Sequence, residues 1–102
     1  MAKVMVGKAS DIGEGKMTAV TAGGKEVLVA NVGGTYYAMN NICTHAGAQL
    51  NEGTLQGKQV VCPWHGAKWD VTTGNLEWFP QKLKPLGSYK VTVEDGTVYV
   101  EV

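Results

Sequence analysis

Residues 43–66 read CTHAGAQLNEGTLQGKQVVCPWHG, and this stretch contains every cysteine and histidine of the 102-residue chain. Cys43 is followed two positions later by His45, and Cys62 is followed three positions later by His65. Each short segment therefore offers one sulfur and one nitrogen as potential metal ligands. We expect the two segments to form loops that hold one metal centre between them.

Two cysteines and two histidines suit two kinds of metal centre. One is a tetrahedral zinc site, and the other is a [2Fe–2S] cluster in which the cysteines bind one iron and the histidines bind the other. Structural zinc sites usually pair cysteine with cysteine and histidine with histidine, whereas both pairs here are mixed. The mixed pairing favours iron–sulfur, and a structural zinc-binding interaction module is the alternative.

The two segments, Cys-Thr-His and Cys-Pro-Trp-His-Gly, resemble the C-x-H and C-x-x-H cluster loops of the Rieske family. The resemblance covers residues 41–93 and includes an aromatic-Asp pair, a Thr-Gly turn, a proline loop and a Pro-Leu-x-x-Tyr-x-Val strand. The matching positions are Trp69, Asp70, Thr73, Gly74, Pro80, Pro85, Leu86, Tyr89 and Val91.

This resemblance implies an all-β, Rieske-like fold of antiparallel sheets, with residues 1–102 as a single Rieske [2Fe–2S] domain. Residues from about 41 to 79 would form a small cluster-binding subdomain. The cofactor would be one [2Fe–2S] cluster, with Cys43, His45, Cys62 and His65 as its ligands.

The function implied by the resemblance is that of an electron carrier, not of an enzyme. Such a ferredoxin takes one electron from a flavin reductase and passes it to an oxygenase or another oxidoreductase. A Rieske-like small subunit fixed to a larger reductase is a further alternative.

The ligand set also bears on the reduction potential. Two ferric ions, two sulfides and two thiolates sum to zero charge, so adding an electron is less costly than in a four-cysteine cluster. High-potential Rieske proteins carry a further cysteine in each loop, joined as a disulfide, and Ser and Tyr hydroxyls that donate near the cluster. This chain departs at all four positions, which are Ala48, Trp64, Ala67 and Trp69. Fewer donors indicate a soluble ferredoxin of the low-potential class.

Alternating apolar residues predict β-strands at both ends of the chain. The pattern predicts one hairpin from Val91 to Val102 around Asp95-Gly96, and a second from Val27 to Met39 around Gly33-Gly34. Weaker strands are expected at 4–6, 17–21, 59–61 and 68–71. Residues 40–51 show no sustained period, and Pro80 and Pro85 exclude a central strand between them.

Composition and charge limit the remaining function classes. The formal net charge is +0 with scattered lysines and acidic residues, so the sequence shows no basic footprint for nucleic acid. The apolar stretches fall far below the roughly 20 residues that span a bilayer. No signal-peptide core is visible at the N-terminus, so we expect a cytoplasmic protein without membrane contact.

Overall fold

A computed structural model of the chain describes residues 3–42, 49–63, 66–78 and 86–102. In these residues the chain forms β-strands and two short 3₁₀ helices, and no helix is long and apolar enough to cross a membrane. The strands are β1 (Lys3–Lys8), β2 (Met17–Ala22), β3 (Lys25–Val32), β4 (Thr35–Asn40), β5 (Thr54–Gln56), β6 (Gln59–Val61), β7 (Lys68–Asp70), β8 (Leu76–Trp78), β9 (Ser88–Glu94) and β10 (Thr97–Glu101). The 3₁₀ helices are η1 (Ala9–Asp11) and η2 (Leu50–Glu52).

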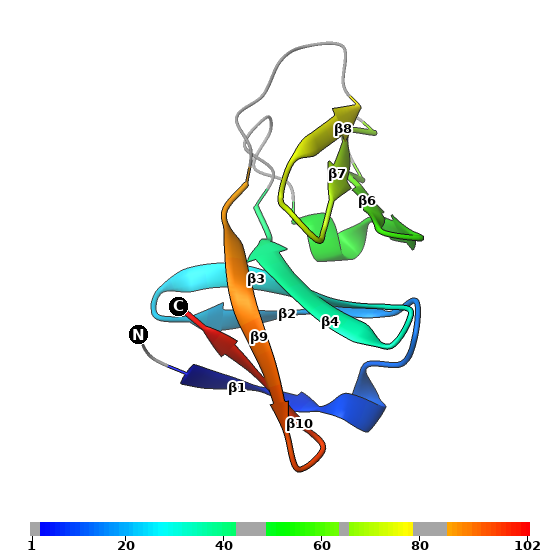
Figure 1. Ribbon diagram of the computed structural model, residues 1–102. Helices are drawn as coiled ribbons and strands as arrows, with labels where there is room; N and C mark the ends of the chain where they lie inside the picture. The colour runs from blue at the N-terminus through cyan, green and yellow to red at the C-terminus, as the bar shows by residue number, and fades with distance from the viewer. Residues whose placement is uncertain (1–2, 43–48, 64–65, 79–85) are drawn as a thin grey trace.

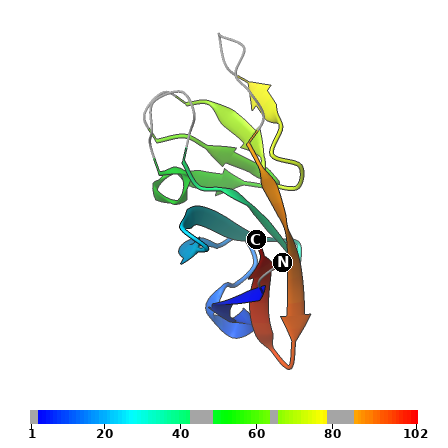
Figure 2. The ribbon, with the colours of Figure 1, turned by 90° about the vertical axis from the view of Figure 1, so that its left-hand side faces the viewer.

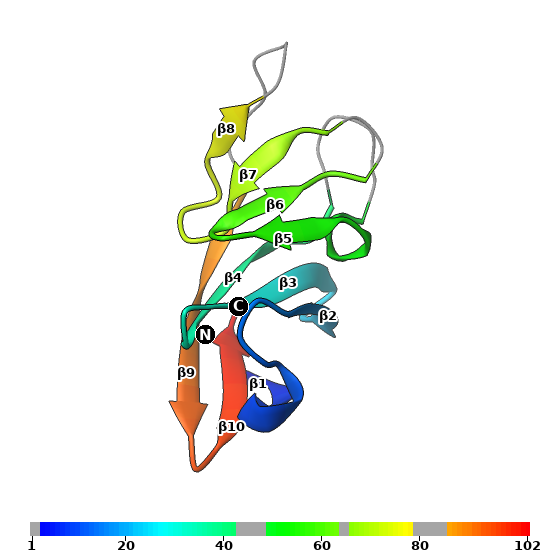
Figure 3. The same ribbon diagram turned by 90° about the vertical axis from the view of Figure 1, so that its right-hand side faces the viewer.

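The strands form two antiparallel sheets (Figure 1). The larger has six strands in the order β1-β10-β9-β4-β3-β2, and the smaller has four in the order β5-β6-β7-β8. Figure 3 shows the smaller sheet stacked over β3 and β4 at one end of the molecule. The all-β fold of antiparallel sheets that the sequence predicted is confirmed.

The six-stranded sheet encloses a core of its own. Its two halves, β1-β10-β9 and β2-β3-β4, are joined by only two pairs between β4 and β9, Ala38 with Tyr89 and Met39 with Ser88. One buried cluster contains residues of both halves, so the halves face each other (Figure 2). Its fully or almost fully buried members are Ile12, Ala22, Val27, Val29, Ala38, Val98 and Val100.

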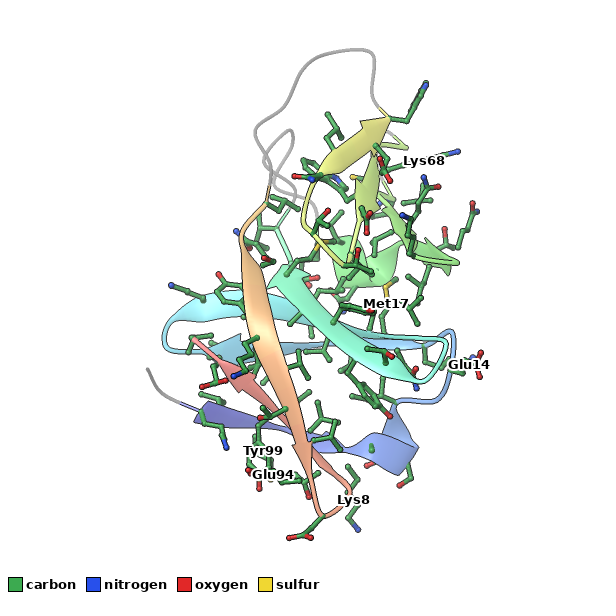
Figure 4. The ribbon with its side chains drawn as sticks, viewed as in Figure 1. Lys8, Glu14, Met17, Lys68, Glu94 and Tyr99 are labelled. Atoms are coloured by element: carbon green, nitrogen blue, oxygen red, sulfur yellow. The ribbon has the colours of Figure 1, made fainter. Side chains whose placement is uncertain are left out.

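Strand β3 is buried on both faces, and this explains its sequence. Val27 and Val29 point into the core of the six-stranded sheet, while Leu28 and Ala30 belong to a second cluster beneath the four-stranded sheet. Successive side chains of a strand point to opposite faces, so a strand between two cores reads as an unbroken apolar run. Met17 of β2 packs against the second cluster, and Figure 4 shows it on the side of the four-stranded sheet.

The predicted hairpins are confirmed. β9 and β10 join through Asp95 and Gly96, with φ of 51° and 76°, and β3 and β4 join through Gly33 and Gly34. Both central residues of a tight hairpin turn need positive φ, which glycine adopts without strain.

The predicted strand at 59–61 is present with the predicted ends, and those at 4–6, 17–21 and 68–71 are present with ends that differ by one or two residues. The sequence does not predict β5 and β8, because their single apolar-polar alternations, Thr-Leu-Gln and Leu-Glu-Trp, do not distinguish a strand from a loop. The predicted proline segment, Pro80 to Pro85, lies outside the described residues.

Candidate metal centre

The second predicted ligand segment begins where the hairpin of β6 and β7 ends. Cys62 directly follows β6, and its N–H donates to the Ala67 carbonyl at 2.8 Å, so the ladder extends one pair beyond the strands. The Cys62 carbonyl then accepts from the Gly66 N–H at 3.2 Å, with Gly66 at φ +72°. The ends of the segment that contains His65 are thereby joined, and the sheet fixes the backbone of Cys62.

The ends of the first ligand segment are joined through asparagine. Ile42 and Gln49 form an isolated antiparallel bridge on either side of residues 43–48. Just outside it, the fully buried Asn41 donates through Nδ2 to Asn51 Oδ1 at 2.8 Å and accepts at Oδ1 from the Asn51 N–H at 2.9 Å. The Leu50 N–H also donates to the Asn41 carbonyl at 2.7 Å. Asn41 is therefore a clamp across the base of this segment.

A close backbone contact joins the two segments. Gly53 follows η2, and a Cβ at this position would lie 1.9 Å from the carbonyl oxygen of Val61, the residue that precedes Cys62. Gly53 has an ordinary φ of −85°, so this contact, and not its backbone conformation, requires glycine. The chain leaving the first segment is thus in van der Waals contact with the strand that carries Cys62.

Of the four predicted ligands, the described residues include only Cys62. Its side chain is buried in the cluster of residues beneath the four-stranded sheet. Cys43, His45 and His65 lie outside the described residues, as do Ala48 and Trp64, two of the positions where the chain departs from high-potential Rieske proteins. The structure therefore places the ends of both ligand segments without testing the ligand set itself.

The other two departure positions, Ala67 and Trp69, are both fully buried in the same cluster as Cys62. Ala67 carries no polar side-chain atom. Trp69 carries an indole N–H, and this buried donor has no hydrogen-bond partner among the described residues.

Asp70 organises the turn after β7. Burial disfavours its charged form, but Thr72 donates to Oδ1 from Oγ1 at 2.6 Å and from N at 2.9 Å, and Lys58 Nζ lies 3.3 Å from Oδ2. The hydrogen bonds and the lysine outweigh the burial, so the pKa of Asp70 lies below its ordinary value. The carboxylate is held as a charged structural group.

The other ion pairs of the described residues lie far from the ligand segments. Lys3 Nζ contacts Glu94 Oε1 at 3.1 Å, and Lys90 Nζ lies 3.8 Å from Glu101 Oε2, both on the β1-β10-β9 half. Figure 4 shows Glu94 at the opposite end of the molecule from Lys68 of the four-stranded sheet. These surface pairs are screened by solvent and have no part in the candidate site.

The comparisons with known proteins agree with this geometry. The Rieske [2Fe-2S] domain family matches residues 2–92. The chain belongs to the Rieske family. It is 38% identical over 95 residues to the ferredoxin component of the naphthalene 1,2-dioxygenase system of Pseudomonas putida, covering 91% of this chain and 88% of that protein.

Two solved Rieske structures have the same fold. The ferredoxin of carbazole 1,9a-dioxygenase from Nocardioides aromaticivorans IC177 has a TM-score of 0.91 at 32% identity, covering 98% of this chain and 97% of the other. A chain in a complex of reduced oxygenase and oxidized ferredoxin in carbazole 1,9a-dioxygenase has a TM-score of 0.90 at 39% identity, with coverage of 96% and 91%. The predicted family, the single [2Fe–2S] cofactor and the role of electron carrier are confirmed.

Sequence reasoning missed the residues that join the segments. Asn41 and Asn51 flank the first ligand segment, and Gly53 follows it, so paired asparagines on either side of an aperiodic stretch were the available signal. That signal is weak, because asparagine is common in turns of every kind.

Proposed function

We propose that Cys43, His45, Cys62 and His65 bind the [2Fe–2S] cluster of this Rieske domain, and that residues from about 41 to 79 form its cluster-binding subdomain. The cluster supplies a centre that accepts and releases one electron. The observation that carries the proposal is the position of Cys62, which is buried at the end of the β6-β7 ladder. Gly53, in the chain that leaves the first segment, contacts the carbonyl oxygen of Val61, the residue that precedes Cys62. Within the family match these are the only cysteines and histidines of the chain.

The chain's own residues contribute position and solvent exclusion. The ladder pair of Cys62 and Ala67 fixes the Cys62 backbone, and burial keeps its sulfur away from water. The Asn41 clamp fixes the base of the other segment. A site with fixed ligands reorganises little when its charge changes by one, which favours fast electron exchange.

We further propose that the electron comes from a flavin reductase and goes to an oxygenase. The relatives support this, because they are named as ferredoxin components of dioxygenase systems, and one solved structure is described as a complex with an oxygenase. Separate ferredoxin components also favour a diffusing carrier over a subunit fixed to a larger reductase. Cytoplasmic localisation stays a prediction, which cell fractionation tests.

The ligand proposal is tested by metal analysis and spectroscopy of purified protein. We expect two irons and two acid-labile sulfides per chain, and the EPR signal of a reduced [2Fe–2S] cluster with nitrogen couplings from two histidines. His45→Cys and His65→Cys should each lower the reduction potential, because each adds a negative ligand. A colourless protein with one zinc would contradict the proposal and support the zinc module.

The partner proposal is tested by mixing reduced protein with an oxidised oxygenase component in a stopped-flow instrument. The naphthalene and carbazole dioxygenase oxygenases are suitable probes. We expect oxygenase reduction at a rate that rises with ferredoxin concentration. An intact cluster that reduces neither oxygenase, nor accepts electrons from a flavin reductase, would contradict this assignment.

A further inference from the structure

The indole N–H of Trp69 is a buried donor without an acceptor among the described residues. Trp69 is fully buried, so water at the surface cannot serve as its partner. Nearly all buried donors in folded proteins are paired, because an unpaired one loses its hydration without compensation. The indole therefore requires an acceptor that the described protein atoms do not supply.

The register of the sheet places Trp69 on the same face as Cys62. Trp69 is opposite Val60 in the β6-β7 pairing, and Cys62 is opposite Ala67 two residues further along. Residues two apart on a strand share a face, so Cys62 and Trp69 are diagonal neighbours. Diagonal neighbours are about 7–8 Å apart, within reach of a long aromatic side chain.

Four buried members of the cluster that contains Trp69 lie at the ends of the ligand segments or of residues 79–85. Leu50 closely follows the first segment, Cys62 and Ala67 flank the second, and Leu86 directly follows residues 79–85. Trp69 thus shares a buried cluster with a residue that follows the first ligand segment and with residues at both ends of the second.

We propose that Trp69 Nε1–H donates a hydrogen bond to a sulfur of the cluster, either a sulfide or a cysteine thiolate. The inference rests on the ligand set proposed above. The indole nitrogen has a hydrogen and no lone pair available, so it can only donate, and a negatively charged sulfur is a suitable acceptor. The donor interacts more strongly with the sulfur after reduction, when the cluster is more negative, so Trp69 raises the potential.

This role corrects the sequence interpretation of position 69. From the sequence, Trp69 is interpreted as the loss of a hydroxyl donor, because high-potential Rieske proteins have a tyrosine at this position. Trp69 replaces that hydroxyl with another donor, whereas Ala67, opposite Cys62, has none. Trp69 is therefore a positioning residue that tunes the cluster through its sulfur.

The first test is the reduction potential of the intact protein after Trp69→Phe, which removes the donor and keeps an aromatic ring. The matched control is Trp78→Phe, the same change at a side chain that is 54% exposed on the neighbouring strand β8. We expect Trp69→Phe to decrease the equilibrium constant for reduction about tenfold, which is 59 mV for one electron. Trp78→Phe should leave the potential unchanged.

The second test uses wild-type protein, so it does not depend on a variant that assembles its cluster. Protein labelled with ¹⁵N at the indole nitrogen is reduced and measured by pulsed EPR, before and after exchange into deuterated water. We expect one coupled ¹⁵N and one coupled exchangeable deuteron, both kept in Trp78→Phe. Both should be lost in Trp69→Phe if that variant assembles its cluster.

Absence of the ¹⁵N coupling in the reduced wild type would overturn the proposal, as would equal potentials in the two variants. A hydrogen bond to a backbone carbonyl instead would make Trp69→Phe less stable without moving the potential. Failure of the ligand proposal is distinguishable, because wild-type protein would then lack the [2Fe–2S] signal altogether.

Discussion

The six-stranded sheet and the four-stranded sheet achieve stability by different means. In the six-stranded sheet, strands of five to eight residues bury alternating valines between two halves, and glycine turns join neighbouring strands. In the four-stranded sheet each strand has three residues, and the chain between strands is fixed by close backbone contacts and buried polar groups. The first is stabilised mainly by apolar burial, whereas the second relies on individual close contacts, and both ends of the second ligand segment belong to it.

Gly53→Ala should have the largest effect of the changes considered. Its Cβ would lie 1.9 Å from the Val61 carbonyl oxygen, so the backbone next to Cys62 must move. We expect a loss of about 3 kcal/mol or more in unfolding free energy, together with poor cluster incorporation. Thermal unfolding and the iron content per chain measure both.

The matched control for that change is Gly57→Ala in the turn between β5 and β6. Gly57 has φ +61° but nothing within 4 Å of an added Cβ, so only backbone strain of about 1–2 kcal/mol is expected. Equal losses in the two variants would show that the Gly53 contact does not matter.

Asn41→Ala should come next, because it removes both side-chain hydrogen bonds to Asn51 from a fully buried position. We expect a loss of about 2–3 kcal/mol and faster release of iron to a chelator. Asn31 makes a matched pair of side-chain bonds within the six-stranded sheet, to the Ile12 carbonyl and from the Gly34 N–H.

Asn31→Ala should therefore lower the unfolding temperature by a similar amount without speeding iron release. If both variants released iron at the same rate, the clamp across residues 43–48 would have no special role.

Val98→Ala tests the core of the six-stranded sheet. Val98 is fully buried, so the Val98→Ala variant should lose about 2 kcal/mol in unfolding free energy, or roughly 10 °C in unfolding temperature. The reduction potential of the cluster should stay unchanged. Val93 is its partner in the β9-β10 register but is 48% exposed, so Val93→Ala should change stability little. A shifted potential in Val98→Ala would show that the two sheets are coupled.

Asp70→Asn should have the smallest effect, about 1 kcal/mol at neutral pH. The pKa of Asp70 is lowered in the folded protein, so its contribution is complete above the unfolded pKa of about 3.9. The contribution is lost as the pH falls through the folded pKa. The difference in unfolding temperature between wild type and variant should thus stay constant from about pH 7 to 5 and shrink below about pH 4.

The control is Glu77→Gln, which changes an exposed carboxylate on the neighbouring strand β8. Its unfolding temperature should equal that of the wild type at every pH. If the difference in unfolding temperature between wild type and Asp70→Asn instead grew as the pH fell, the charged carboxylate would not be the form that stabilises the fold.

The sequence by itself determined the family, the cofactor and the two hairpins. These features follow from local patterns, namely the mixed Cys-His pairs, the glycine turns and the period-two valines.

Only the three-dimensional structure decided which atoms meet around the ligand segments. The contact of Gly53 with Val61, the pairing of Asn41 with Asn51 and the position of Trp69 beside Cys62 each depend on the register of short strands and on the turns around the ligand segments. The sequence patterns do not predict these contacts, because a glycine needed for space resembles a glycine needed for a turn and asparagine is common in turns of every kind. Trp69 shows the consequence most clearly, because its residue type suggested a lost donor and only its burial revealed an unpaired one.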